Sequence, residues 1–159
     1  MHYRLYTSAD FPQLYAIEEI CFQPPLRFPR SYMRRVIENP DSATWIAEGE
    51  EKMAGFAIVE WAGPPGDCYA YIQTLEILPE HRRRGIGQEL LHRLETSAAQ
   101  AGAAEIWLHV DAANTPAIRL YRALGYQKTG SEQDYYGRHR PADVYSKTIR
   151  PGTRSAADS

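Results

Sequence analysis

The sequence has few cysteines, no long apolar run and no large excess of charge of either sign. The two cysteines among 159 residues, Cys21 and Cys68, lie far apart without metal-ligand spacing, so we expect reduced thiols, no metal and a cytoplasmic protein. No apolar run reaches the roughly 18 residues of a membrane span, and the N-terminal residues lack the apolar core of a signal peptide. The net charge of −2 argues against general polyanion binding, because nothing basic dominates the surface. Membrane and nucleic-acid partners are therefore not expected.

The size and the residue patterning indicate one α/β domain. The chain length fits a single domain over residues 1–150, and the small polar residues at 151–159 indicate a disordered tail. Apolar periodicity and turn residues give the order β-α-α-β-β-β-α-β-α-β-β. The simplest packing is a mixed central sheet of about seven strands with four helices. The mid-chain strand, helix and strand should form a parallel crossover.

Three segments carry local signals that bear on the site. Ser31 is expected to cap a short helix that Asn39-Pro40 ends. Residues 69–78 are rich in aromatic and β-branched side chains and should form the longest strand. The letters EIWLHV at 105–110 are a nearly continuous apolar run, which predicts a strand covered on both faces.

A basic turn with two glycines follows the strand expected at 69–78. Glycine lets the backbone approach a ligand closely, and the first N–H groups of the following helix have no internal partner. These groups and the helix dipole favour an anion, and arginine adds charge in a geometry that suits phosphate. A solvated surface turn is the alternative, and the pattern is neither a P-loop nor a dinucleotide motif. The residues concerned are Arg82, Arg83, Arg84, Gly85, Ile86 and Gly87.

Two motifs in this order resemble the signatures of the GCN5-related N-acetyltransferases, the GNAT superfamily. Arg82-x-x-Gly85-x-Gly87 resembles the family's pyrophosphate-binding motif, and Asn114-x-x-Ala117-x-x-x-Tyr121 resembles its second signature. The resemblance spans about residues 2–149. It implies the GNAT fold and an acetyltransferase that uses acetyl-CoA as cosubstrate. The cofactor-binding residues that it implies are Leu75, Glu76, Ile77, Leu78, Arg82, Arg83, Arg84, Gly85, Ile86, Gly87, Gln88, Asn114, Ala117 and Tyr121.

His109 is the first candidate for a general base, because histidine titrates near neutral pH. On spacing alone, a core histidine bonded to a backbone carbonyl is the more common case, and Tyr71 and Tyr121 could equally be packing residues. The segments YIQTL (71–75) and LHV (108–110) resemble strands of the NatE-type amino-terminal acetyltransferases. That resemblance implies that Tyr71 and His109 act together as the base through ordered water, with Tyr121 as the general acid. The bacterial ribosomal-protein alanine acetyltransferase is similar overall, but it has Glu at the place of His109.

Two further loops resemble the acceptor groove of the NatE-type enzymes. RFPRSY (27–32) resembles the loop that lines the pocket for the first residue of a peptide, and DYYGRHRPAD (134–143) resembles the facing loop. An aromatic-rich surface hairpin is the alternative for each. Arg30 and Gln73 are polar departures from the family pattern. The implied substrate-binding residues are Phe28, Pro29, Tyr32, Gln73, Tyr135 and Tyr136.

These resemblances predict a specific acceptor. An α-amine with a pKa of about 8 suits a modest base better than a lysine side chain near about 10.4. We therefore expect acetylation of a protein or peptide N-terminus by direct attack on the thioester, by a monomer or homodimer. The alternatives are a small-molecule amine of the polyamine or aminoglycoside type as acceptor, or a catalytically silent CoA-binding regulatory domain.

Overall fold

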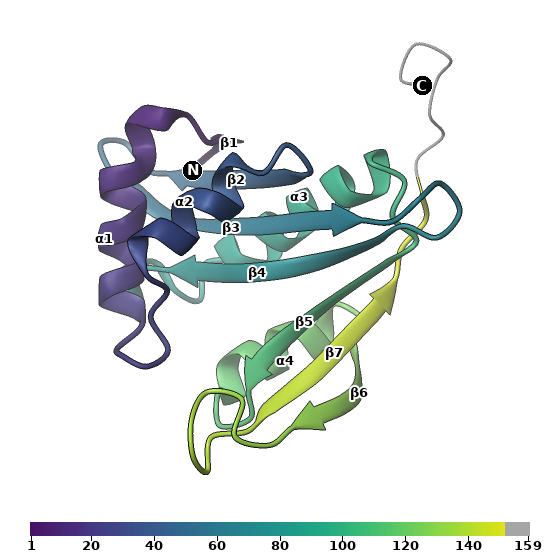
Figure 1. Cartoon of the computed structure of the whole chain (residues 1–159). Helices are drawn as coiled ribbons and strands as arrows, with labels where there is room; N and C mark the ends of the chain where they lie inside the picture. The colour runs from purple at the N-terminus through teal and green to yellow at the C-terminus, as the bar shows by residue number, and fades with distance from the viewer. Residues whose placement is uncertain (152–159) are drawn as a thin grey trace.

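Seven strands form one mixed sheet in the computed structural model, which describes residues 1–151 (Figure 1). The sheet order is β1-β2-β3-β4-β5-β7-β6, and β4 and β5 run parallel as predicted. The strands are β1 (His2–Leu5), β2 (Ser42–Glu48), β3 (Met53–Ala62), β4 (Tyr69–Ile77), β5 (Glu105–Asp111), β6 (Gln127–Glu132) and β7 (Ala142–Thr148). The helices are α1 (Phe11–Cys21), α2 (Arg30–Glu38), α3 (Ile86–Gln100) and α4 (Thr115–Ala123). The predicted fold class and element order are confirmed, while the tail predicted at 151–159 lies, apart from Pro151, outside the described residues.

Helices cover both faces of the sheet and define two apolar layers (Figure 1). On one face α1 and α2 bury Phe11, Leu14 and Met33 against Phe56 of β3. On the other face α3 packs its apolar stripe, which recurs at helical spacing, against β2, β3 and β4. Each fully buried leucine in such a layer stabilises the fold by about 1.5–3 kcal/mol. β4 therefore packs between α1 on one face and α3 on the other.

β4 and β5 pair over only half of their length. The register joins Tyr69–Ile72 of β4 to Glu105–Leu108 of β5, and the two strands then diverge (Figure 1). On its other side β4 pairs with β3, but the register shifts so that Gln73 lies between the paired residues Ile72 and Thr74. Such a bulge bends a strand and re-aims a side chain. The C-terminal halves of β4 and β5 are therefore separated by a cleft.

Two local predictions are wrong. α2 begins at Arg30 rather than after Ser31, because the Pro29 carbonyl accepts the N–H of Met33 and opens the helix one residue earlier. β5 is not covered on both faces: Ile106, Leu108 and Val110 are buried, whereas Trp107, His109 and Asp111 alternate with them and are partly exposed. The cleft is lined by the C-terminal end of β5, with residues from both faces of the strand, Leu108, His109, Val110 and Asp111.

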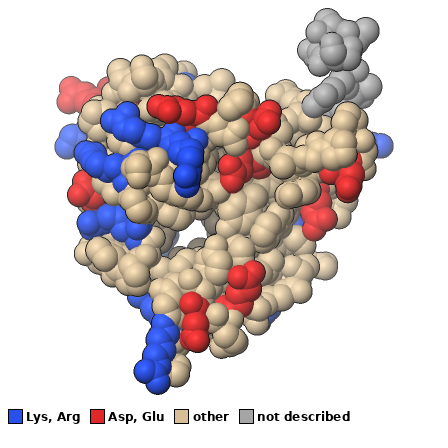
Figure 2. Space-filling view, in the orientation of Figure 1, with Lys and Arg blue, Asp and Glu red and all other residues tan. Residues whose placement is uncertain are grey.

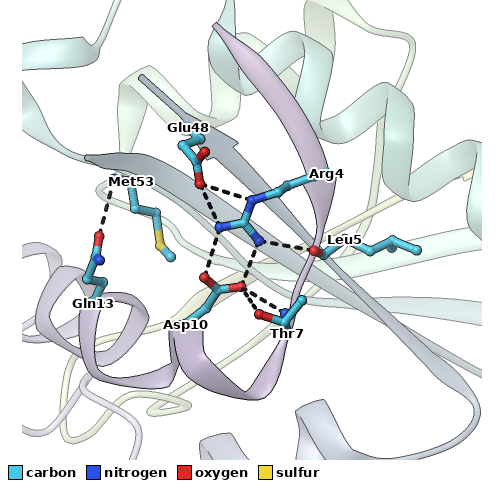
Figure 3. Close-up of polar contacts among 7 residues, drawn as sticks. All are labelled: Arg4, Leu5, Thr7, Asp10, Gln13, Glu48 and Met53. Carbon is cyan, nitrogen blue, oxygen red and sulfur yellow. Dashed lines mark hydrogen bonds and ion pairs between the residues drawn. The ribbon is translucent and has the colours of Figure 1, made fainter. Parts of the chain in front are cut away.

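An ion-pair network ties the N-terminal strand to the sheet (Figure 3). The Arg4 guanidinium donates to both carboxylate oxygens of Asp10 at 2.8 Å and to Glu48 at 2.6 Å and 2.9 Å. Asp10 also accepts from the Thr7 backbone N–H at 2.8 Å, so its carboxylate closes the turn before α1. Hydrogen bonding to Arg4 lowers the pKa of Asp10 to about 2. Within residues 1–151, no helix is long and apolar enough to cross a membrane.

Candidate active site

The cleft between β4 and β5 gathers predicted residues from the second family-like motif, from β4 and β5, and from both acceptor loops, whereas the basic turn at 82–87 lies outside its lining. In the space-filling view the molecule is hollowed between the part that carries α1, α2 and β4 and the part that carries β5 to β7 (Figure 2). The predicted residues that line this cleft are Phe28, Gln73, Leu75, His109, Asn114, Ala117, Tyr121 and Tyr136. The lining residues that were not predicted are Phe22, Leu26, Ile72, Thr74, Leu108, Val110 and Asp111. Phe22 and Leu26 lie between α1 and α2 and carry no motif, and Ile72, Thr74, Leu108 and Val110 are buried strand residues of the kind that a sequence pattern assigns to the core.

Tyr71 and His109 are in direct contact. The Tyr71 Oη lies 2.8 Å from His109 Nδ1, and the Tyr71 ring packs against Trp107 at 4.5 Å between centroids. Burial, together with the neighbouring Tyr135, raises the pKa of Tyr71 well above its usual value. The Tyr71 phenol is therefore protonated at neutral pH. A proton can pass between these two side chains without an intervening water.

The second nitrogen of His109 contacts a carboxylate that sequence reasoning missed. His109 Nε2 lies 2.9 Å from Glu132 Oε1, on β6. The imidazole is flanked on one side by Tyr135, stacked at 4.2 Å and 9°, and by Trp107 at 5.2 Å. No sequence spacing signals the contact with Glu132, because it depends on β7 lying between β5 and β6 in the sheet.

Tyr121 lies on the α4 side of the same cleft. Its ring is buried and meets Tyr126 edge-on at 5.7 Å. Burial raises the pKa of Tyr121, so its hydroxyl carries a proton at neutral pH. Asn114 caps α4 by accepting the Ala117 N–H at 3.3 Å, which places the start of this helix at the cleft.

The predicted phosphate turn leads into the N-terminus of α3. Gly85 is the N-cap residue, with a left-handed φ of 80°, and no side chain caps the helix. The first N–H groups of this 15-residue helix are therefore available to an anion. Arg83 and Arg84 are exposed beside them, whereas Arg82 Nε donates to the Ile77 carbonyl at 2.9 Å and thereby holds the turn. A phosphate-bearing ligand fits this arrangement.

Gly87 and Glu76 show how the turn is attached to the core. A Cβ on Gly87 would lie 3.1 Å from both Ile77 Cδ1 and Leu120 Cδ2, so the glycine allows α3 to approach β4 and α4. Glu76 is buried toward α1, and burial together with the charge of Glu18 raises its pKa well above the ordinary value. The Glu76 side chain is thus turned away from the turn, and only its backbone can reach a cofactor. Ile77 and Leu78 are partly buried, and Gln88 is exposed on the first turn of α3.

The acceptor loops face each other across the bulge of β4. Tyr32 Oη donates to Gln73 Oε1 at 2.9 Å, and Gln73 Nε2 donates in turn to Glu60 of β3. Phe28 packs against Tyr32 at 5.0 Å, and Tyr135 meets Tyr136 edge-on at 4.9 Å. Pro29 lines a neighbouring groove with Phe28, Ser31, Tyr32 and Arg35. The polar residue at position 73 is therefore part of a hydrogen-bonded chain, which sequence reasoning missed because it did not consider Glu60.

Comparisons with known proteins decide the family. A model of the Acetyltransferase (GNAT) family matches residues 11–126, which is more than half of the chain. The chain belongs to the GNAT acetyltransferase family. This confirms the predicted family and the class of enzyme, with acetyl-CoA as the family's cosubstrate.

Individual relatives point to more than one kind of acceptor. The streptothricin acetyltransferase of Streptomyces lavendulae is 35% identical over 100 residues, which are 62% of this chain and 52% of that protein. The crystal structure of the ribosomal-protein-S18-alanine N-acetyltransferase from Escherichia coli has a TM-score of 0.81 at 25% identity, with 97% of each chain covered. Arabidopsis thaliana Naa50, solved with the bisubstrate analogue CoA-Ac-MVNAL, has a TM-score of 0.81 at 26% identity and covers 93% of this chain and 98% of its own. This GNAT chain spans about half the length of the curated relatives that it matches.

Proposed function

We propose that this protein transfers the acetyl group of acetyl-CoA to the α-amino group of a protein or peptide N-terminus. The observation that carries the proposal is the Tyr71–His109 contact of 2.8 Å, located between two tyrosine-bearing loops at the cleft. A similar fold in Naa50, which was solved with a peptide-bearing bisubstrate analogue, supports a peptide as acceptor.

The cofactor is held mainly by backbone groups in this proposal. The N-terminus of α3 and the exposed Arg83 and Arg84 bind the pyrophosphate, while Asn114 and Ala117 line the path of the pantetheine arm. Beyond Ile72 the edge of β4 that faces β5 has no strand partner among the described residues. A backbone N–H in this stretch, near Leu75, polarises the thioester carbonyl and stabilises the oxyanion.

Proton transfer is assigned to three side chains. The acceptor amine attacks the thioester carbon while its proton moves to the Tyr71–His109 pair. Tyr121 supplies a proton to the departing CoA thiolate, because its buried hydroxyl is protonated at neutral pH. Tyr32, Tyr135 and Tyr136 position the acceptor, and Phe28 and Gln73 contact its first residue.

A small amine is the second candidate acceptor, and two observations favour it. The relative with 35% identity is named as a streptothricin acetyltransferase. The acceptor side of the cleft also has carboxylates, Glu60 through Gln73 and Glu132 through His109, which suit a polycationic amine.

A paired acceptor panel tests the proposal. Peptides with varied first and second residues, and the same peptides with blocked N-termini, are incubated with labelled acetyl-CoA beside small polyamines and aminoglycosides. Mass spectrometry is expected to place the label on free peptide N-termini and not on blocked ones. Label on small amines alone would support the second candidate, and absence of CoA thiol release with every acceptor would indicate a silent CoA-binding domain.

A further inference from the structure

We propose that Glu132 is a positioning residue that orients His109 and stabilises its imidazolium form during proton transfer. The inference rests on the proposed role of Tyr71 and His109 as the base. It does not depend on whether the acceptor is a peptide or a small amine. The contact that carries it is the 2.9 Å separation of His109 Nε2 and Glu132 Oε1.

The sheet brings the three side chains together from three strands. Tyr71 is on β4, His109 on β5 and Glu132 on β6, and β7 lies between β5 and β6. The His109 side chain is only 8% exposed, whereas that of Glu132 is 52% exposed. The imidazole is therefore enclosed by Tyr71, Trp107 and Tyr135, with its Nε2 directed at a carboxylate near solvent.

The Glu132 carboxylate decides the direction of both hydrogen bonds. An ionised carboxylate only accepts, so Nε2 carries the ring proton of a neutral imidazole and donates it to Glu132. Nδ1 is then unprotonated and accepts from the Tyr71 hydroxyl, which keeps its proton at neutral pH. Glu132 therefore selects the tautomer whose Nδ1 can accept a proton from the cleft, which is the role of a carboxylate behind a histidine base.

The protons balance when Tyr121 is included. As the amine nitrogen bonds to the acetyl carbon and the bond from that carbon to the CoA sulfur breaks, the amine proton passes to Tyr71 Oη and the Tyr71 proton passes to His109 Nδ1. His109 then bears both ring protons and a positive charge opposite the Glu132 carboxylate. The departing thiolate takes the Tyr121 proton, and solvent exchange restores His109 and Tyr121 after the products leave. The nearby carboxylates Asp111 and Asp143 are paired with Arg140 at 3.1 Å and Lys128 at 3.4 Å. Glu132 thus faces the imidazole while these neighbours are neutralised by their own cations.

Substitution of Glu132 tests the role, with Glu105 as a matched control. Glu105 is an exposed carboxylate at the start of β5, about 13 Å along the strand from His109 at 3.3 Å per residue. Glu132→Ala is expected to lower kcat by about tenfold, which is less than the roughly 100-fold expected for loss of the base itself, without changing the Kd of acetyl-CoA. Glu132→Gln should retain more activity than Glu132→Ala, because its amide oxygen still accepts from Nε2. Glu105→Ala should match the wild type.

Two readouts separate positioning from a merely structural role. The acidic limb of the kcat/KM profile should move to lower pH in Glu132→Ala, because the imidazolium has lost its anionic partner. High salt should reduce the difference between wild type and Glu132→Gln, since an exposed carboxylate is screened. The imidazole ¹⁵N spectrum reports the contact without turnover: Glu132→Ala should shift the His109 Nε2 signal, and Glu105→Ala should not.

Distinct results would overturn the inference. They are an unmoved Nε2 signal in Glu132→Ala, equal rate losses in the Glu132 and Glu105 variants, or a loss confined to the KM of the acceptor. If no acceptor is acetylated by the wild type, the proposed function fails, and the Nε2 signal still decides the contact. If the wild type is active and His109→Ala is slow while Glu132→Ala is normal, this inference alone fails.

Discussion

The two halves of the cleft are built in different ways. The proposed cofactor half comes from one continuous segment, which starts at Leu75 in the cleft lining and runs to Gln88, and it offers backbone groups, a left-handed glycine and a helix N-terminus. The proposed acceptor half is assembled from side chains of separate segments. Phe28, Gln73, His109 and Tyr136 line the cleft, and Tyr32, Tyr71 and Tyr135 contact these lining residues. Side-chain substitutions should therefore change acetyl-CoA binding only mildly in the first half, and they should change turnover or acceptor preference in the second.

The largest effect is expected from His109→Ala. Loss of a general base lowers turnover by about 100-fold, since base catalysis contributes roughly 10²–10⁴. The Kd of acetyl-CoA should be unchanged, because the cofactor half does not include the imidazole. Steady-state kinetics and calorimetric titration measure the two quantities. His92→Ala, an exposed histidine on α3, serves as control. Turnover that stays at the wild-type level across the pH range would remove His109 from the mechanism.

A glycine substitution tests the cofactor half. Gly85→Ala should raise the KM for acetyl-CoA by about tenfold, because a left-handed alanine costs roughly 1–2 kcal/mol and the turn will relax from the phosphate-binding shape. A Cβ at this position meets nothing within 4 Å, so the backbone conformation, and not a clash, is the cause.

Gly66→Ala is the matched control for this substitution. Gly66 has a φ of 88°, similar to the 80° of Gly85, and also has nothing within 4 Å of an added Cβ. It lies in the loop between β3 and β4, outside the proposed cofactor segment Leu75–Gln88. Both variants should lose similar thermal stability, but only Gly85→Ala should change the KM. An equal effect on KM would mean that the strain acts through global stability.

The difference between a half built from one continuous segment and a half assembled from several segments also explains how much of each the sequence could predict. The cofactor half and the strand order follow from local signals: glycine and arginine after a strand, helical periodicity, and proline or glycine at element ends. Glu132 could not be predicted, because it reaches His109 only through the sheet order β5-β7-β6. Glu60 reaches Gln73 across the β3–β4 hairpin, where the bulge at Gln73 shifts the register away from simple alternation. The apolar run at 105–110 misled for a related reason, since Trp107 is an apolar residue that is partly exposed and packs against Tyr71 and His109 rather than under a covering layer.

The acceptor half can be probed at its polar departure from the family pattern. Gln73→Leu removes the bonds to Tyr32 and Glu60, so we expect a shift of several-fold in kcat/KM toward acceptors with an apolar first residue. The KM for acetyl-CoA should remain within error. The peptide panel measures the preference, and Gln100→Leu, at the exposed end of α3, is the control. An unchanged preference would show that Gln73 does not contact the first residue.

The smallest effect on activity is expected from Glu76→Gln. Glu76 lies inside the proposed cofactor segment, but its side chain is buried toward α1. Its pKa is raised above the ordinary 4.5 by burial and by Glu18, so the stability that it contributes is fully present below pH 4.5 and is lost as pH rises through the folded-state value. Glutamine cannot ionise, and its amide oxygen can still accept from the Thr74 hydroxyl, which bonds Glu76 at 2.6 Å. The variant should therefore have a higher Tm than the wild type at pH 7 to 8, with the gap closing toward pH 4.5.

Thermal melts across this pH range, with the exposed Glu51→Gln as control, measure the difference between wild type and Glu76→Gln. Acetyl-CoA kinetics should not change, because in this segment the backbone and not the Glu76 carboxylate faces the cofactor. A raised KM for acetyl-CoA, or a lower Tm at neutral pH, would contradict the assignment of Glu76 to the core. An unchanged KM with a raised Tm would show that the proposed cofactor half keeps its function when a buried ionisable group beneath it is removed, as a site built from backbone groups should.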